Sequence, residues 1–354
     1  MPVTLTLAMI VKNEEETLER CLKSVCPFVD EIIIADTGST DKTKSVAAHF
    51  TDKIFDFEWC DDFSAARNFA FGKATGDYIM WLDADDVIEG DNAQKFCDLK
   101  KTLQKNAPDV VMCRYNISFD ENGTPTFTYY RERIFRRAAN LQWQGFVHEC
   151  IVPQGKVVYS DAAVSHRKEK ENGRRNLELY QKTIFRRQLV SAREKYYYGR
   201  ELYYNRLYQE SICILEDVLT DTTLWKTDAI GACQIIYDCN LALKKYDAAL
   251  AAALKSFSYG LPRAEILCRI GDLFEMKRDY KTAIYWYEAA INSPDVSKEG
   301  GFLNPAYRTF IPYLELSVCY YHSGDKNTAK IYHNKAKEIS PRHPAILNNE
   351  KYFR

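Results

Sequence analysis

The sequence predicts an α/β domain followed by an all-α domain of helical repeats, and three observations lead to this prediction. In the first half, short apolar runs of strand length alternate with segments whose apolar residues recur at helical spacing. Clusters of polar residues follow these strands, and open α/β sheets bind ligands at that end of their strands. From Lys168 onward helical spacing dominates. We expect an α/β domain at 1–168, a linker helix at 169–191 and a repeat domain at 192–354.

Composition indicates an ordinary globular protein. The chain has 354 residues, of which 46% are hydrophobic and 27% are charged. Lys and Arg number 48 against 49 Asp and Glu, so net charge gives no reason to expect a nucleic-acid partner. The 11 scattered Cys include no Cys-x-x-Cys pair, which indicates reduced thiols. There is no basic leader and no apolar run of membrane-spanning length, so we expect a cytoplasmic protein without a transmembrane segment.

The elements of the first half follow in order. Asn13 is expected to cap the first helix, with Glu16 completing a capping box, and Ser64 is expected to cap a later helix. Strands separated by helices imply a parallel sheet with right-handed crossovers. The expected strands are 4–11, 31–35, 53–57 and 78–82, and the expected helices carry Leu18 to Val25, Val46 to Phe50, and Phe63 to Phe71.

The order of elements then becomes antiparallel. Val110–Phe119 and Thr126–Arg136 flank an Asn122-Gly123 pair, which is a strong hairpin signal. Further short strands are expected as far as about Val164. The predicted sheet is therefore mixed.

The second half contains four repeating windows, which begin at Ala192, Ile230, Ala264 and Phe310. Small and aromatic residues coincide between them, most clearly in the third window. Antiparallel helices of any kind would show similar spacing, but the coincidences favour a pattern that resembles tetratricopeptide repeats. Such arrays bind partners or pack on neighbouring domains, and a homodimer formed through them is one expected assembly.

Two Asp residues end the fourth expected strand. Asp83 and Asp85 stand at positions i and i+2, which point the same way in an extended segment. A lone Asp-x-Asp is common and usually caps a turn or helix. Placed at a strand's carboxyl end, however, two carboxylates suit a hard divalent cation such as Mg²⁺, which completes its coordination with substrate phosphates.

Polar clusters follow each strand, and a doubly wound sheet would gather them into one crevice. Several carboxylates, one Arg and helix N-termini together suit a metal-bound nucleoside diphosphate. Asp36 and Asp83 can accept hydrogen bonds from a nucleobase or ribose, and Arg67 can face the diphosphate or stack near the base. The clusters are Lys12–Glu15, Asp36–Ser39, Asp61–Asn68 and Asp83–Asp85.

Four segments in order carry a resemblance to a known family. They are Ala8–Glu15, Ile33–Asp41, Phe63–Asn68 and Trp81–Asp86. The α/β half resembles an inverting family-2 glycosyltransferase with the GT-A fold. The resemblance implies a UDP-sugar donor and a Mn²⁺ or Mg²⁺ ion that Asp85 holds against the two phosphates. It implies that the nucleotide is held by Val11, Glu15, Asp36, Arg67 and Asp83.

The segment Trp143–Glu149 resembles the acceptor side of this family. Glu149 is the candidate base, and His148 is the alternative base or a group that orients the sugar or diphosphate. Trp143 offers a face for the sugar ring. The competing interpretation makes Trp143 a core residue and the His-Glu pair a polar patch at a strand end. His166 is a candidate third metal ligand, as a late His is in many GT-A enzymes.

A helical repeat array behind such a domain is similar to the arrangement in enzymes that glycosylate bacteriocin peptides, including sublancin-type Cys S-glycosyltransferases. We therefore expect a metal-dependent hexosyltransferase that moves a sugar from a nucleotide-sugar to an acceptor, such as a peptide Cys or Ser. A cell-envelope saccharide or lipid precursor is an alternative acceptor. A different class also remains open, in which a degenerate nucleotide-binding domain serves as a scaffold while the repeats bind a protein partner.

Overall fold

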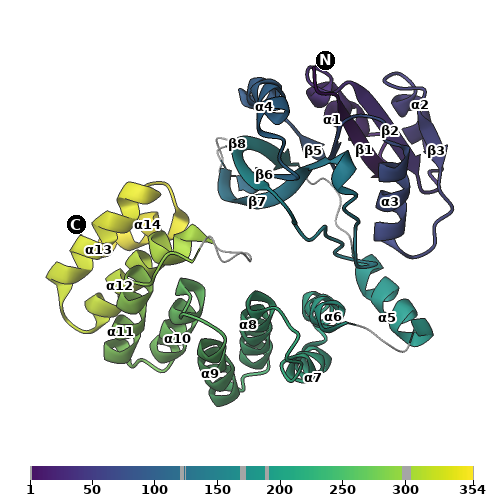
Figure 1. Ribbon diagram of the computed structural model, residues 1–354. Helices are drawn as coiled ribbons and strands as arrows, with labels where there is room; N and C mark the ends of the chain where they lie inside the picture. The colour runs from purple at the N-terminus through teal and green to yellow at the C-terminus, as the bar shows by residue number, and fades with distance from the viewer. Residues whose placement is uncertain are drawn as a thin grey trace. The chain divides into compact units, whose positions relative to one another are not determined.

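The computed structural model describes residues 2–119, 123, 125–167, 173–187, 191–296 and 304–353. Asn122 of the expected turn, Lys168 and parts of the expected linker lie outside these residues. The chain divides into two compact units, Met1–Thr183 and Ile184–Arg354 (Figure 1). The first unit extends beyond the expected boundary at 168 because Tyr180 and Lys182 of a following helix contact Val147 and Asp61.

The first unit contains an eight-stranded mixed sheet in the order β3-β2-β1-β4-β7-β6-β8-β5. Strands β1 to β4 pair in parallel, which confirms the predicted parallel part, and β7 joins β4 in antiparallel fashion. The strands are β1 (Leu5–Val11), β2 (Glu31–Asp36), β3 (Ile54–Asp56), β4 (Tyr78–Trp81), β5 (Asp86–Val87), β6 (Val110–Phe119), β7 (Pro125–Arg136) and β8 (Val157–His166).

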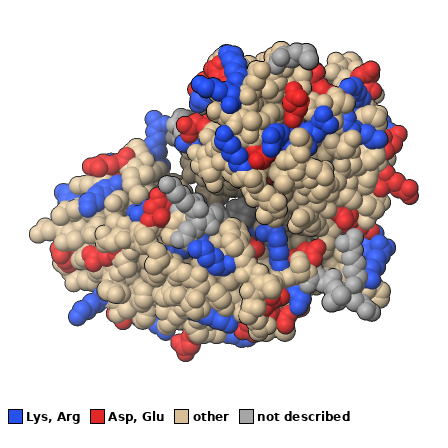
Figure 2. Space-filling model, viewed as in Figure 1, with Lys and Arg blue, Asp and Glu red and all other residues tan. Residues whose placement is uncertain are grey.

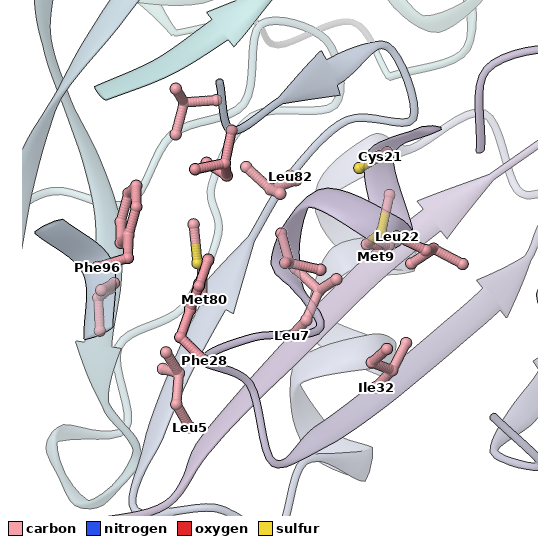
Figure 3. Close-up of a cluster of buried hydrophobic side chains, with 14 of the residues drawn as sticks. Leu5, Leu7, Met9, Cys21, Leu22, Phe28, Ile32, Met80, Leu82 and Phe96 are labelled. Carbon is pink, nitrogen blue, oxygen red and sulfur yellow. The ribbon is translucent and has the colours of Figure 1, made fainter. Parts of the chain in front are cut away.

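Helices cover both faces of this sheet (Figure 1). Alternate residues of β1 point to opposite faces, so Leu7 packs beneath α1 while Ala8 packs beneath α3. Figure 3 shows the first of these clusters, where Leu5, Leu7 and Met9 meet Leu22 and Phe96. Burial of both faces explains the nearly continuous apolar runs of the strands. The helices of this unit are α1 (Leu18–Val25), α2 (Thr43–Ala47), α3 (Phe63–Lys73), α4 (Asn92–Asn106) and α5 (Arg175–Arg187).

The predicted caps of α1 and α3 are wrong. Asn13 has a left-handed backbone, with φ of 56°, and its side-chain oxygen accepts the Thr40 N–H at 2.8 Å. It therefore ties the end of β1 to the loop after β2, and α1 begins only at Leu18. Asp62 caps α3 by accepting the Ala65 N–H at 3.0 Å, while Ser64 donates to the same carboxylate.

The antiparallel half of the sheet confirms the predicted hairpin strands. β6 pairs with β7 in antiparallel and with β8 in parallel orientation. The short strand β5, directly after the Asp pair, crosses to β8 and pairs Asp86 with His166. This rung brings a residue near the end of β8 to the fourth polar cluster.

The second unit consists of antiparallel helix pairs, which confirms the predicted tetratricopeptide-like repeats. Small residues allow close packing within a pair, because a Cβ atom on Gly271 would lie 2.7 Å from the Tyr287 ring. The helices are α6 (Ala192–Tyr204), α7 (Tyr208–Val218), α8 (Lys226–Ala242), α9 (Tyr246–Lys255), α10 (Ala264–Met276), α11 (Tyr280–Ile291), α12 (Phe310–His322), α13 (Lys326–Ile339) and α14 (Pro344–Asn349).

The charged surface and the apolar character of the helices can also be compared with the sequence. Acidic and basic side chains are interspersed on the face shown in Figure 2, as the formal net charge of -1 suggests. Among the described residues, we find no helix with the length and apolar character needed to cross a bilayer.

Candidate functional site

Arg67 connects two carboxylates at the centre of the first unit. It lies on α3 with 6% of its surface exposed. Its Nη2 donates to Asp83 Oδ1 at 2.7 Å, and its Nε donates to Glu149 Oε1 at 2.6 Å. The guanidinium also lies over the rings of Trp81 and Trp143, at 4.7 and 4.9 Å. Three segments distant in sequence therefore meet at one side chain.

The charges of this cluster stabilise one another. Burial works against the charged form of Arg67, but Asp83 and Glu149 outweigh it and raise its pKa above the usual value. Burial likewise works against the Asp83 carboxylate, but Arg67, aided by Arg133 and Arg131, lowers its pKa below the ordinary range. Both groups are therefore ionised at neutral pH.

The segment Trp143–Glu149 is held against α3 by hydrogen bonds. The Asn68 side chain accepts the Trp143 N–H at 2.9 Å and donates to the Trp143 carbonyl at 3.0 Å. The Phe63 N–H donates to the Phe146 carbonyl at 2.9 Å. Tyr180 of α5 packs on Phe146 and donates to the Val147 carbonyl. These contacts fix the approach of Glu149 to Arg67.

The two other candidates in this segment have different surroundings. Trp143 is 3% exposed and packs edge-on against Trp81 and Phe71, so its ring lies in the core beneath Arg67. The competing interpretation of this Trp, as a core residue, describes its position. His148 is half-buried, has φ of 54° and stacks beside the Tyr180 ring.

The Asp pair stands in a turn and not in a strand, which corrects the predicted geometry. β4 ends at Trp81, and the chain turns through Asp83 to enter β5 at Asp86. Asp83 meets Arg67, while Asp85 meets His166, whose Nδ1 lies 3.4 Å from Asp85 Oδ1. The two carboxylates thus belong to neighbouring but distinct sets of contacts.

Asp85, Asp86 and His166 form the candidate cation site, since one potential ligand atom of each lies within 4.8 Å of the others. Burial, together with Asp83 and Asp86, raises the pKa of Asp85 to about 6, although His166 opposes this shift. Burial lowers the pKa of His166, but a hydrogen bond to Asp86 and the nearby carboxylates raise it overall. Concentrated negative charge of this kind would be relieved by a divalent cation.

A further group of predicted residues gathers at the ends of β1 and β2. Asp36 is 1% exposed, and its Oδ2 accepts the N–H groups of Gly38 and Ser39 at 3.1 and 2.9 Å. Its buried Oδ1 has no hydrogen-bond partner among the described residues. Glu15 accepts the Lys42 N–H at 2.9 Å, and the Val11 carbonyl accepts the Thr37 N–H at 2.9 Å. The orphaned Asp36 oxygen fits a nucleobase or ribose donor.

Sequence reasoning missed Asp86, Tyr115 and Arg133. Asp86 is fully buried and bonds to both of the others. The run Asp83–Asp86 was visible, but the partners come from β6 and β7, and nothing in the local pattern marks them. Alternation along β7 places Arg131 and Arg133 on one face, where both guanidinium groups lie over the Trp81 ring.

Comparison with known proteins finds a family model that matches most of this unit. The family model Glycosyl transferase family 2 matches residues 6–156. This part of the chain is therefore similar to glycosyl transferase family 2 domains. That range holds all of the predicted site residues except His166, which lies in the β8 strand after it.

Two curated relatives share this domain. A TPR repeat-containing protein of Synechococcus elongatus is 37% identical over 147 residues, covering 41% of this chain and 35% of the relative. The glycosyltransferase SunS of Bacillus phage SPbeta is 27% identical over 255 residues, covering 68% of this chain and 59% of the relative. The chain thus spans between about a third and three fifths of these relatives. The match to SunS, at 255 residues, is longer than the first unit, Met1–Thr183, and so extends into the helical unit.

Solved structures give only distant matches. The crystal structure of S. aureus TarS is 14% identical, covers 67% of this chain and 49% of its own, and has a TM-score of 0.37. A score this low says nothing about substrate or acceptor, so the fold assignment depends on the strand order and on the family match.

Proposed function

We propose that this protein is an inverting, metal-dependent glycosyltransferase that uses a nucleotide-sugar donor. The observation that carries the proposal is the pair of contacts that Arg67 makes with Asp83 and Glu149 inside a family 2 domain. A candidate cation site lies beside this cluster, and the Asp36 oxygen that has no hydrogen-bond partner among the described residues supports binding of the base or ribose there. Together these three features support binding of a nucleotide-sugar.

Asp85 and His166 are the residues that suit a cation best. Asp85 keeps 23% of its side chain exposed, as does His166, whereas Asp86 is fully buried. Carboxylate oxygen and imidazole nitrogen both suit Mn²⁺, and carboxylate also suits Mg²⁺. A divalent cation held there would neutralise the charge that develops on the departing diphosphate.

The reaction is a substitution at the anomeric carbon of the sugar. A nucleophile of the acceptor forms a bond to this carbon while the bond from carbon to the diphosphate oxygen breaks. Glu149 takes the proton of the acceptor, and His148 is the alternative base. Arg67 holds Glu149 in place and places a fixed positive charge at the site.

We propose UDP as the nucleotide and a peptide Cys or Ser as the acceptor. The match to the glycosyltransferase SunS supports this choice, because it covers 68% of this chain and so includes helical repeats as well as the α/β unit. A thiol acceptor ionises more readily than a hydroxyl and requires less help from a base. We further propose that the protein works in the cytoplasm, where its eleven free cysteines would stay reduced.

The test is hydrolysis of UDP-sugars in the presence and absence of Mn²⁺. We expect metal-dependent release of UDP by the wild-type protein and its loss in Asp85→Ala. The matched control is Asp98→Ala, which removes an exposed Asp of α4 that pairs with Lys101. A preceding thermal-shift screen of nucleotide-sugars with Mn²⁺ selects the donor.

Equal turnover by Asp85→Ala and wild type would contradict the proposed cation site. If the wild-type protein neither binds nor hydrolyses any nucleotide-sugar, the alternative scaffold function is favoured. The same assay, repeated with candidate peptides that carry Cys or Ser, identifies the acceptor by the mass of one added hexose.

A further inference from the structure

Asp86 has more hydrogen-bond partners than any carboxylate around it in the described site. It is fully buried, and Oδ1 accepts the Tyr115 hydroxyl at 2.9 Å and faces His166 Nδ1 at 3.1 Å. Oδ2 accepts the Asp83 N–H at 3.1 Å and pairs with Arg133 Nη1 at 3.1 Å. A carboxylate has about four lone-pair sites, and three hydrogen bonds and one ion pair surround those of Asp86.

Proximity alone would make Asp86 a cation ligand, because its oxygens lie within 4.8 Å of ligand atoms of Asp85 and His166. Its partners lead to a different role. An oxygen of Asp86 that bound a cation would lose a hydrogen bond from Tyr115, His166 or the Asp83 N–H, or its ion pair with Arg133. Such a loss is costly at a fully buried site.

The charge of Asp86 is balanced within the protein. Arg133 is 0% exposed, and its guanidinium lies 4.0 Å from the Trp81 ring centre and 4.4 Å from that of Tyr115. The ion pair between Arg133 and Asp86 is therefore shielded from water, and it does not depend on a cation for its neutrality.

The strand pairing holds His166 against Asp86. β5 and β8 pair Asp86 with His166 and Val87 with Ser165, so the two side chains face each other on a fixed rung. With Nδ1 directed at a carboxylate, the neutral ring carries its proton on Nδ1 and leaves the lone pair on Nε2.

We propose that Asp86 is a positioning residue: it holds His166 as the Nδ1–H tautomer, so that Nε2 is the atom offered to a divalent cation. The inference rests on the proposed function, because it concerns the same cation site. Carboxylates that accept the second N–H of a metal-binding His fix the ring and raise its basicity as a ligand. In this arrangement Asp85 and His166 bind the cation and Asp86 does not.

A competing arrangement places the cation at His166 Nδ1, where it would bridge to Asp85 and Asp86. The distance of 3.4 Å from Nδ1 to Asp85 Oδ1 allows such a bridge. The cation would then displace the Nδ1 proton and cost Asp86 one of its hydrogen bonds. The two arrangements therefore differ in which ring nitrogen binds the metal.

The first experiment observes the imidazole nitrogens directly. The protein contains six His, so ¹⁵N-His labelling gives few signals, and a His166→Gln sample assigns those of His166. At alkaline pH without metal we expect His166 to carry its proton on Nδ1. On addition of ¹¹³Cd²⁺ we expect coupling to Nε2. A proton on Nε2, or cadmium coupling to Nδ1, would overturn the inference.

The second experiment uses Asp86→Asn. The amide oxygen of Asn suits Arg133 and the Asp83 N–H, both of which are donors, so its NH₂ group turns toward His166. The ring must then accept at Nδ1 and carry its proton on Nε2. We expect this switch of tautomer together with a loss of Mn²⁺ affinity of about 10- to 100-fold, measured by electron paramagnetic resonance of free Mn²⁺.

Asp98→Asn is the matched control and should keep wild-type Mn²⁺ affinity, because its carboxylate is exposed on α4. Unchanged affinity in Asp86→Asn would contradict the positioning role. If Asp86→Asn does not fold, the wild-type tautomer and cadmium coupling still decide. A protein that shows the expected tautomer and coupling without hydrolysing any UDP-sugar would contradict the proposed function and leave this inference intact.

Discussion

The Nε atom of Arg67 lies 2.6 Å from Oε1 of Glu149, so the proposed base is bound to the guanidinium that also holds Asp83. This contact joins the proposed donor side of the site to the proposed acceptor side. It also allows the two tasks of Glu149, proton transfer and support of Arg67, to be separated by substitution.

Glu149→Gln keeps an oxygen for Arg67 but cannot take a proton. We expect sugar transfer to slow by about 10²- to 10⁴-fold, while the Kd of the donor changes by less than about threefold. Single-turnover transfer and donor titration measure the two effects. A nearly wild-type rate in Glu149→Gln, with loss of transfer in His148→Gln, would assign the base to His148 instead.

Arg67→Ala leaves two carboxylates without their buried partner. We expect the free energy of unfolding to fall by about 3 kcal/mol, because removal of one member of a buried ion pair leaves uncompensated charge. Urea denaturation without metal or donor measures this loss. The control is Arg114→Ala, whose exposed pair with Asp161 should contribute less than about 1 kcal/mol. A loss of less than about 1 kcal/mol in Arg67→Ala would show that the Arg67 cluster contributes no more than an exposed ion pair.

Glu315 of α12 should make the repeat unit sensitive to pH. Burial, with Glu275 and Asp272 nearby, raises its pKa to about 8 from the model-compound value of 4.5. Between these two values the folded protein holds a proton that the unfolded chain has released. Stability is therefore highest at the acid end of this range and falls as pH rises toward 8, with a slope of at most about 1.4 kcal/mol per pH unit.

Glu315→Gln tests this expectation, because the amide does not titrate. Denaturation followed at several pH values should show a flatter profile than the wild type over this range. Glu338→Gln, an exposed change on α13, should keep the wild-type slope. A wild-type slope in Glu315→Gln as well would assign the pH dependence to other groups.

Gly271→Ala should destabilise the third helix pair. The new Cβ would meet the Tyr287 ring at 2.7 Å, and that ring is anchored by hydrogen bonds from its hydroxyl to Asp272 and Glu275. We expect a loss of about 1–3 kcal/mol from overpacking. Gly260→Ala, where the nearest atom is a methyl of Ile230 at 3.5 Å, is the control. Thermal denaturation compares the two, and equal melting temperatures would show that the Tyr287 ring can move aside.

The sequence predicted the meeting of Arg67 with Asp83 better than it predicted local geometry, and the contact of Arg67 with Glu149 was not predicted. Strand ends and helix starts are visible as patterns, and the sheet brings them together whatever the details of each loop. The predicted common orientation of Asp83 and Asp85 was wrong because β4 ends at Trp81. Side chains two residues apart point the same way only inside a strand.

The contacts of Asp86 could not be predicted from the sequence for a different reason. Its partners Tyr115, Arg133 and His166 belong to β6, β7 and β8, and they meet it only through the register of the parallel and antiparallel pairing among these strands. A shift of one residue would turn each side chain to the other face. Pattern reasoning finds strands, but it does not supply that register.

The packing of Tyr180 on the segment that holds Glu149 determines where the chain can be truncated. The family match ends at residue 156, yet α5 runs from Arg175 to Arg187. A truncated protein that stops at the end of the match would lose the Tyr180 ring that packs on the segment before Glu149. Chimeras that exchange the repeat array should therefore be joined downstream of α5.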